Sequence, residues 1–356
     1  MATPKIRTAV VASESGAKGE SQRFVGANGE INASSTKDLL QRAHQLQLAH
    51  ASGAVETEAQ NTERAAFHKR NRDLLQAAFR DPQALRVLGE KMADDIYMTS
   101  NRKGVARRFL NKMELKQGDI PRFPVRRKNA QAVWVSSPTR VETEILTDKW
   151  LMPPELQLVA RLFVPQNEIN QSNTDVLEEK YVEGLEAIMV SEDRMWYNLV
   201  QASVGIDNSA TVVTGTLSPT ALMNVRQRVA RWGLKAAFCY MASDLFVDIV
   251  GDASFIAAIE PVARHELVMT GSLATLYGMT LISEAYRHPE HKVLSEGEFV
   301  VVSDPVTHGA YADRGGVDSQ PIDQVSERVP GKGWLLSESW AAAIANARSV
   351  ASAVRI

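Results

Sequence analysis

The sequence is poor in several features, and each shortage excludes a class of protein. Cysteine occurs once in 356 residues, at Cys239, so no disulfide can form within the chain. No run approaches the roughly 18 apolar residues of a membrane helix, and no signal-peptide core precedes the polar stretch 13–20. The net charge of −2 gives no global sign of a nucleic-acid or membrane partner. We therefore expect a chain that folds in a reducing cytoplasm and contacts no membrane.

Motifs of catalysis and cofactor binding are also missing. Neither G-x-G-x-x-G nor G-x-S-x-G occurs. Gly331-Lys-Gly333 lacks the flanking residues of a phosphate loop and predicts a turn. His288-Pro-Glu-His291 predicts an exposed turn, His265-Glu266 lacks the second histidine of a metalloprotease motif, and Cys239 in its apolar run predicts a buried, inert thiol. We predict no catalytic residue, no cofactor and no metal, and hence no enzyme.

The amino-terminal region combines a polar segment with helices. Residues 1–36 contain too few large apolar side chains to offset their own ordering entropy, so a neighbouring chain would have to hold them. Helices are predicted from Thr36 to near Gly53 and from Glu56 to Arg80. A third begins at Asp81-Pro82 and ends near Gly104, with apolar residues at helical spacing: Leu85, Leu88, Met92 and Ile96.

Residues 102–149 form a basic stretch. Twelve lysines and arginines against five acids give it +7, so the rest of the chain must carry −9. Ile120–Arg127 and Ala132–Leu146, joined by a turn at Lys128-Asn129, predict a long β-hairpin. Such a hairpin is marginal alone and needs a surface to lie against.

The next segment is the most regular. Leu156–Val164 predicts a strand, Pro165–Asn170 a connection, and Asn173 or Thr174 the cap of a helix that continues to about Ala202. About 30 residues at ~1.5 Å each give a rod of roughly 45 Å. One face carries an apolar stripe: Leu177, Tyr181, Leu185, Ile188, Met189, Met195, Trp196 and Leu199. The other face is acidic, with a net charge of −5.

A compact unit of helices and strands is predicted after Gly205. Its expected elements are a helix from Ser218-Pro219 to Gly233, a strand Leu234–Ala242, helices Asp244–Gly251 and Phe255–Leu267, a strand Leu276–Ser283 with a turn at Gly278, a strand Glu298–Asp304, a loop His308–Gly316, and a last helix capped by Ser337 that contains Trp340, Ile344 and Val350.

This order of elements resembles the Hong Kong 97-type capsid fold. The resemblance is carried by Leu156–Ile169 with the long helix that reaches Glu192-Asp193, by the Ser218-Pro219 helix and strand, and by Gly271–Ser283. It covers residues 85–350, most of the chain. It implies an α+β fold with an N-terminal arm, a β-hairpin called the E-loop, a peripheral domain built on a long spine helix, and an axial domain.

The resemblance also implies domain boundaries. They are an N-terminal arm with helices (1–84), a helix leading into the E-loop (85–101), the E-loop (102–150), the peripheral domain (151–210, with the spine helix at about 173–202), the axial domain (211–297), and return strands of the peripheral domain with a C-terminal helix (298–356).

The implied function is that of the major capsid protein of a tailed bacteriophage. Such subunits form hexamers and pentamers of an icosahedral shell around double-stranded DNA, which they hold without reading its sequence. Scaffolding, portal and decoration proteins are the implied further partners. The implied location is the virion, after assembly in the host cytoplasm.

Charge suggests how subunits meet. We expect the basic hairpin of one subunit to lie over the acidic helix of a neighbour, with electrostatics setting the register and buried apolar residues supplying most of the affinity. The candidate contact residues are Arg122, Arg126, Arg127, Lys128 and Trp134 on the hairpin, and Glu178, Glu179, Glu183, Glu186 and Glu192 on the helix.

Two alternatives stay open. One is the shell of a cellular encapsulin-type nanocompartment, which the long arm disfavours and which a cargo-peptide site would support. The other is an α/β enzyme whose active site no motif reveals. The size of the assembled material separates a shell, which forms megadalton particles, from an enzyme, which forms a small closed oligomer.

Overall fold

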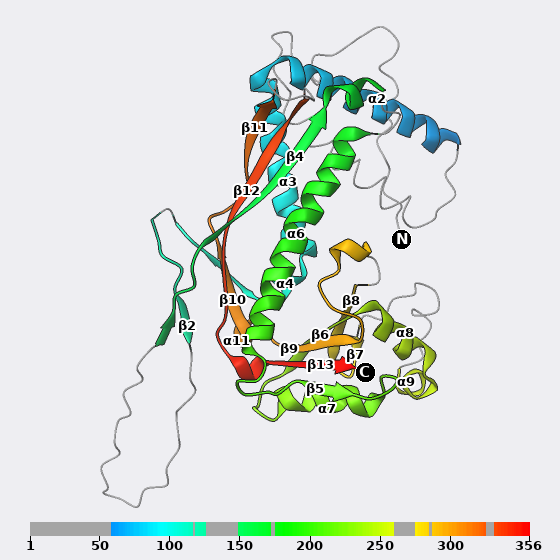
Figure 1. Ribbon diagram of the computed structural model, residues 1–356, viewed down its shortest axis with the longest axis vertical. Helices are drawn as coiled ribbons and strands as arrows, with labels where there is room; N and C mark the ends of the chain where they lie inside the picture. Colours follow the sequence, from blue (N-terminus) through cyan, green and yellow to red (C-terminus); the bar gives the residue numbers. More distant parts are fainter. Residues whose placement is uncertain are drawn as a thin grey trace, which may run out of the picture. The chain divides into compact units, whose positions relative to one another are not determined.

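The structure is a computed structural model that describes residues 58–116, 118–125, 149–171, 175–259, 275–284, 287–324 and 331–356 (Figure 1). The predicted helix from Thr36 to Gly53 lies outside these residues. The chain divides into two compact units. Unit 1 holds the residues up to Met98 with Val159–Leu185 and Val317–Ser337, and unit 2 holds Thr99–Leu158, Glu186–Gly316 and Glu338–Ile356.

Unit 1 packs helices against long strands. Its elements, some of which extend beyond it, are α2 (Glu58–Arg80), α3 (Pro82–Lys103), β4 (Leu156–Pro165), α5 (Gln166–Gln171), the start of α6 (Val176–Ser203), β11 (Asp318–Gln324) and β12 (Gly331–Ile344). The stripe predicted on α3 is confirmed, since Leu85, Leu88, Met92 and Ile96 are all buried. Trp334 of β12 donates its indole N–H to the carbonyl of Leu85 at 2.9 Å, which satisfies its polar atom inside the core.

The glycines of β12 are packing residues, and the predicted turn at Gly331-Lys332-Gly333 is wrong. All three residues lie in β12, which pairs with β4. A Cβ at Gly333 would lie 1.9 Å from the carbonyl oxygen of Leu162, and one at Gly331 would lie 2.5 Å from that of Val164. Only glycine permits this close approach of two backbones.

The spine helix is confirmed as α6, with 28 residues. Its N-terminus is capped by Asp175, whose carboxylate accepts the N–H of Glu178 at 3.2 Å. Most of the predicted stripe is buried: Leu177, Tyr181, Leu185, Ile188 and Trp196. The predicted connection before it contains the short helix α5.

Unit 2 is built on a six-stranded mixed sheet. The strand order is β5 (Thr211–Val213), β13 (Val350–Arg355), β9 (Glu298–Ser303), β6 (Ala236–Met241), β8 (Met279–Ser283) and β7 (Thr275–Leu276). The predicted helices are present as α7 (Pro219–Ala230), capped by Ser218, and α8 (Ser243–Gly251). Of the helix predicted from Phe255 to Leu267, the described part is α9 (Ala253–Ala258). The turn predicted at Gly278 is confirmed and joins β7 to β8.

The sheet is covered on both faces, which explains why residues 299–302 of the central strand β9 are apolar at every position. Phe299 and Val301 of β9 join one core with Leu222 of α7, and α7 lies along that face (Figure 1). Val300 and Val302 join a second core with Trp196 and Phe109. A strand buried on two sides loses the polar–apolar alternation of a half-exposed strand.

This sheet also corrects a domain boundary. The segment from residue 298 was expected to return to the peripheral domain, yet β9 and β13 pair with each other beside β6 and β5. The apolar residues on both faces of these strands belong to the two cores just described, so residue 297 does not separate two domains.

Two further expectations are wrong in unit 2. The predicted loop His308–Gly316 contains the end of α11 (Pro305–His308) and β10 (Gly309–Asp313), which pairs in parallel with β1 (Asn111–Glu114). The predicted last helix is β12, antiparallel to β10 over Trp340–Ile344, followed by a short 3-10 turn and β13.

The structure describes the base of the hairpin, where the second strand begins three residues beyond the predicted Ala132–Leu146. β2 (Phe123–Val125) is antiparallel to β3 (Lys149–Leu151), with Phe123 opposite Leu151. The expected strand ends and turn between residues 126 and 148 lie outside the described residues. Within the described parts of the chain, no helix is both long and apolar enough to cross a membrane.

Candidate subunit-contact surfaces and the ion network behind them

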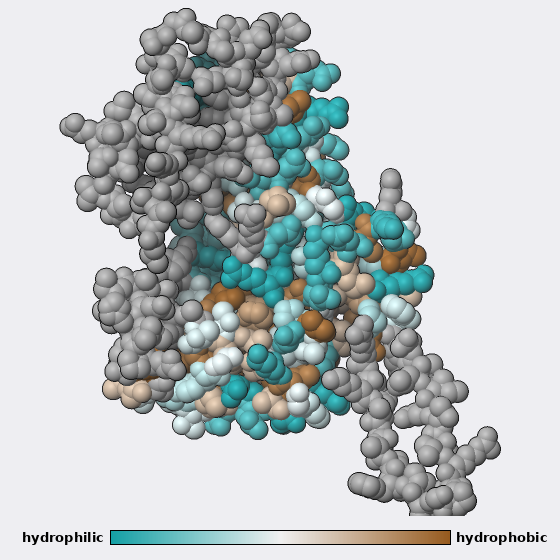
Figure 2. Space-filling view, turned by 180° about the vertical axis from the view of Figure 1, so that it is seen from behind, coloured by the Kyte–Doolittle hydropathy of each residue, from teal (hydrophilic) through white to brown (hydrophobic). Residues whose placement is uncertain are grey.

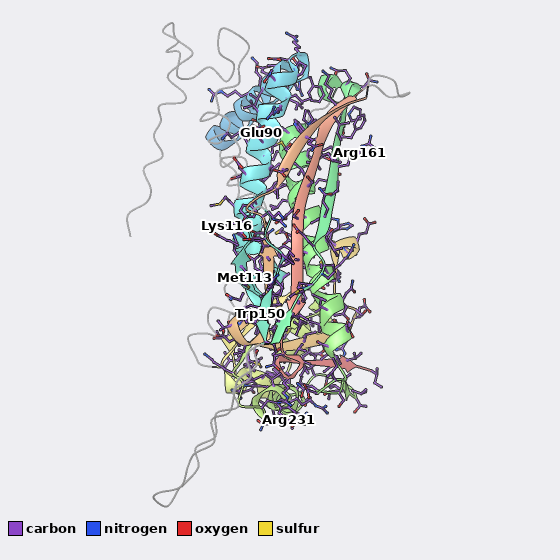
Figure 3. The ribbon with its side chains drawn as sticks, turned by 90° about the vertical axis from the view of Figure 1, so that its left-hand side faces the viewer. Glu90, Met113, Lys116, Trp150, Arg161 and Arg231 are labelled. Carbon is purple, nitrogen blue, oxygen red and sulfur yellow. The ribbon has the colours of Figure 1, made fainter. Side chains whose placement is uncertain are left out.

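The base of the hairpin is anchored by one aromatic side chain. Phe123 is 1% exposed and packs in a cluster of small residues from β10 and β12: Ala310, Ala312, Ala341 and Ala343. Across the pair, Trp150 stands opposite Pro124 and is 53% exposed; Figure 3 labels it on β3. One position of the base therefore points into unit 2 while the other is free to meet a partner.

Arg314 ties the two legs of the hairpin together. Its guanidinium donates to both carboxylate oxygens of Glu155, at 2.5 and 2.7 Å, on the leg that follows β3. On the leg that precedes β2 it donates to the carbonyls of Lys116 and Asp119, at 2.9 and 3.0 Å. The Arg314 hydrogen bond lowers the pKa of Glu155. A planar guanidinium that donates to two chain segments fixes their spacing as well as their charge.

Several exposed apolar side chains lie close to this base along the chain. Ile120, Trp150, Met152 and Leu156 are each between 49% and 60% exposed. On the face seen in Figure 2, hydrophobic residues otherwise lie in small groups among hydrophilic ones. Large apolar side chains held by an anchored base and left in solvent are the usual core of a protein–protein contact.

The structure describes only one of the predicted contact residues on the hairpin. Arg122 is exposed, one residue before β2. Arg126, Arg127, Lys128 and Trp134 lie outside the described residues, so their contacts stay predictions.

The predicted acidic residues of α6 differ in how exposed their side chains are. Glu179 is exposed. The Glu183 side chain is 53% exposed and accepts from Lys180 at 2.7 Å. The Glu186 side chain is 46% exposed and lies 3.1 Å from His291. Glu178, only 9% exposed, lies beside the Asp175 cap.

Glu192 does not belong to this acidic face, which corrects the predicted contact set. Its side chain is fully buried and accepts from Nε and Nη2 of Arg107, at 2.8 and 2.5 Å. The same guanidinium donates to Glu338 at 2.6 Å and lies 4.0 Å from Asp313. One buried cation thus holds acidic residues from α6, β12 and β10.

Burial sets the protonation of this network. It raises the pKa of Glu192 to about 8 and also raises the pKa of Glu338. Burial alone would lower the pKa of Arg107, but its hydrogen bond to Glu192 and the charges of Glu192 and Glu338 raise it overall. The guanidinium also lies over Trp340, 5.1 Å from the ring centroid. Arg107 therefore stays charged in the interior, where Glu192 and Glu338 accept its hydrogen bonds.

Asp193 supplies a second tie from α6. Its carboxylate accepts the N–H of Ala106 at 2.6 Å, at the start of α4 (Val105–Phe109), where the cap residue Gly104 has no side chain to do so. It also pairs with Arg287. Burial raises the pKa of Asp193 to about 6. The acidic pair noted in the sequence therefore organises the interior of unit 2.

Arg107 was counted in the sequence as part of the basic stretch, and its role was missed. The local signal was available, because it lies in a run with Val105, Ala106 and Phe109, all buried. Its partners could not be read from the sequence, since Glu192 and Glu338 lie 85 and 231 positions away.

Two other groups singled out in the sequence lie among the described residues. Cys239 is buried, and burial raises the pKa of its thiol to about 12, which keeps it protonated and confirms the inert thiol. His288 is exposed and caps the short 3-10 helix Pro289–His291, as expected of an exposed turn.

Solved structures identify the fold. A chain of Mycobacterium phage Bobi aligns with a TM-score of 0.51 and 18% identity, over 71% of this chain and 91% of that one. A chain in the capsid structure of cyanophage P-SCSP1u aligns with a TM-score of 0.49 and 10% identity, over 71% of this chain and 88% of that one. A chain of a virus-like particle from Pyrococcus furiosus aligns with a TM-score of 0.42 and 12% identity, over 74% of this chain and 98% of that one. No family model and no curated protein matches the sequence. The first alignment confirms the Hong Kong 97-type fold.

Proposed function

We propose that this chain is the shell subunit, the major capsid protein, of a tailed bacteriophage. The observation that carries the proposal is the base of the hairpin. Phe123 anchors it in unit 2 and Arg314 clamps its two legs, while Trp150 and Met152 stand in solvent. Here, packing and hydrogen bonds hold apolar residues outside the core of their own chain. Such residues are typical of a surface that contacts another copy of the subunit.

The proposed contact joins this hairpin to the spine helix of a neighbour. Residues 122–128 supply positive charge, and Glu179, Glu183 and Glu186 supply the exposed negative charge on α6. Exposed ion pairs contribute only about 0–1 kcal/mol each. Register therefore comes from charge, affinity comes from residues such as Trp150, and each single contact stays reversible enough for a shell to correct errors.

The proposal extends to the wider assembly. Subunits gather into hexamers and pentamers around double-stranded DNA, held without sequence reading, with scaffolding, portal and decoration proteins as further partners. Assembly takes place in the host cytoplasm and ends in the virion. The work of the subunit is conformational and mechanical rather than catalytic.

The first test is the size of the assembled material. The purified chain, expressed with a scaffold where one is needed, is expected to form capsomers or closed particles of megadalton mass in size-exclusion chromatography and negative-stain microscopy. Particles filled with DNA in infected cells support the phage shell, and particles filled with an enzyme would indicate a nanocompartment. A small closed oligomer under all conditions contradicts the shell function.

The second test reverses the charge of the hairpin. The triple variant Arg126→Glu, Arg127→Glu, Lys128→Glu is expected to stay folded by circular dichroism but to form no particles, because it now repels the acidic helix. Adding Glu179→Lys, Glu183→Lys and Glu186→Lys to that variant should restore particles, since attraction returns with opposite signs. Normal shells from the triple variant alone would rule out this contact.

A further inference from the structure

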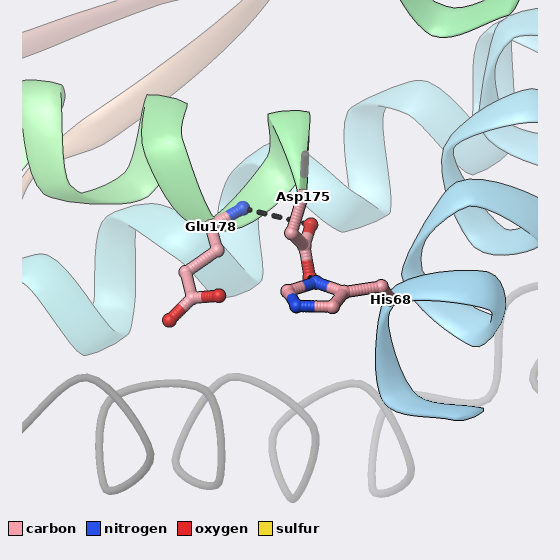
Figure 4. Close-up of side chains that lie close together, drawn as sticks. All are labelled: His68, Asp175 and Glu178. Atoms are coloured by element: carbon pink, nitrogen blue, oxygen red, sulfur yellow. Dashed lines mark hydrogen bonds and ion pairs between the residues drawn. The ribbon is translucent and has the colours of Figure 1, made fainter. Parts of the chain in front are cut away.

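Asp175 has more polar neighbours than a helix cap requires. One carboxylate oxygen accepts the N–H of Glu178 at 3.2 Å and so caps α6. The other lies 3.3 Å from Nδ1 of His68 on α2 (Figure 4). The same oxygen accepts from Nδ2 of Asn71. The Asp175 side chain is 3% exposed, while His68 is 27% exposed. A buried carboxylate beside an imidazole at the edge of solvent has the composition of a metal site.

The geometry fits a small cation. His68, Asp175 and Glu178 each offer a ligand atom, and these atoms all lie within 4.8 Å of one another. Zinc binds imidazole nitrogen and carboxylate oxygen at about 2.0–2.2 Å, which places two ligands roughly 3.5 Å apart. The Glu178 side chain would have to turn toward the other two to close that difference. All three residues belong to unit 1.

A separate observation points to the same place. Asn71 is 2% exposed and lines the small cavity beside His68 and Asp175, yet its Oδ1 has no hydrogen-bond partner within the described part of the chain. Buried amide oxygens in folded proteins are almost always paired, so a single orphan needs an explanation. A bound cation supplies one, because an amide oxygen is a metal ligand as well as a hydrogen-bond acceptor.

We propose that these residues bind one zinc ion, which fastens α2 to the first turn of α6. The two carboxylates outweigh the single positive charge of Arg72, which also lines the cavity. The imidazole favours zinc over magnesium or calcium, which prefer ligand sets made of oxygen alone. His68 and Asp175 are the ligands already in contact, Glu178 is the third, and Asn71 or water completes the set.

The test measures zinc itself on the full-length chain. Metal-free protein is titrated with ZnCl2 by calorimetry, and bound zinc is counted after gel filtration by mass spectrometry. We expect one ion per chain, and binding weakened at least about tenfold in His68→Ala and in Glu178→Gln, because the loss of a ligand costs no less than the loss of a supporting contact. Magnesium and calcium at equal concentration should not displace the zinc.

A matched control separates this site from ordinary surface binding. His291, on the 3-10 helix Pro289–His291, forms a second histidine–carboxylate pair with Glu186 of α6, at 3.1 Å. Its ring lies 5.8 Å from that of His288, and it belongs to no group of three clustered ligand atoms among the described residues. His291→Ala should therefore bind zinc as the unaltered chain does. The inference is overturned if the chain binds no stoichiometric zinc, or if folded Glu178→Gln binds as tightly as the unaltered chain. Particle formation is scored separately, so such a failure leaves the shell function standing.

Discussion

Replacing Arg107 by methionine is expected to lower the free energy of unfolding by about 3–5 kcal/mol, the usual cost of removing one partner from a buried ion pair. Methionine fills similar space, so the loss comes from charge rather than from a cavity. Glu192 and Glu338, both with fully buried side chains, would lose the cation that pairs with them. Asp313 would keep Lys112, at 3.5 Å. The packing of the guanidinium over Trp340 would be lost as well.

Denaturant unfolding of the unassembled subunit measures this effect, and the chain supplies its own control. Arg108 is the next residue on the same helix but is exposed, so Arg108→Met should change stability by no more than about 0.5 kcal/mol. Combining Arg107→Met with Glu192→Gln should recover part of the loss, because one of the uncompensated carboxylates disappears. Equal stabilities of the two single variants would show that the network contributes nothing.

Replacing Gly333 by alanine is expected to lower the free energy of unfolding by about 3 kcal/mol, at the upper end of the range for overpacked cores. The Cβ of Gly333→Ala would lie 1.9 Å from the carbonyl oxygen of Leu162 on the paired strand. A backbone atom fixed in a sheet cannot rotate away as a side chain can. The β4–β12 pairing would have to open, and unit 1 would lose part of its core with it.

Gly251 provides the matched comparison for this variant. It is the last residue of α8, and a Cβ there would meet no atom within 4 Å. Gly251→Ala should therefore leave stability unchanged or raise it by up to about 1 kcal/mol. Thermal unfolding of both variants gives the comparison directly. A Gly333→Ala protein as stable as Gly251→Ala would mean that the two strands do not approach as closely as described.

Much of the fold was predictable because its signals are local. The cap Ser218-Pro219 placed α7, and the apolar stripe of the spine helix placed α6. The run around Cys239 placed β6. In each case, neighbours within four residues along the chain determine the conformation, so periodicity and capping are sufficient.

The errors at β12 and β10 have one physical cause. Ala341–Ala343 prefer a helix in isolation, yet they lie in a strand because β10 hydrogen-bonds along that strand. Glycines before them suggest a turn until the backbone of Leu162 is known to lie against Gly333. Pairing with distant strands overrides local propensity, and one sequence does not reveal the distant partner.

The proposed contact surface rests on charges that can be read from the sequence. Excess basic charge marked the hairpin, and acidic charge marked the helix. Charge counting could not distinguish Glu186, in solvent, from Glu192, two turns further along and fully buried. That distinction depends on Arg107, which the fold brings in from 85 positions away.

The position of β13 has a consequence for timing during protein synthesis. This strand, Val350–Arg355, lies between β9 and β5, so the six-stranded sheet has a gap until these residues leave the ribosome. A nascent chain can form its early helices but cannot complete this unit, whose two cores both include β13 residues. On the proposed function, a subunit whose β13 is still inside the ribosome cannot join a growing lattice in its finished form.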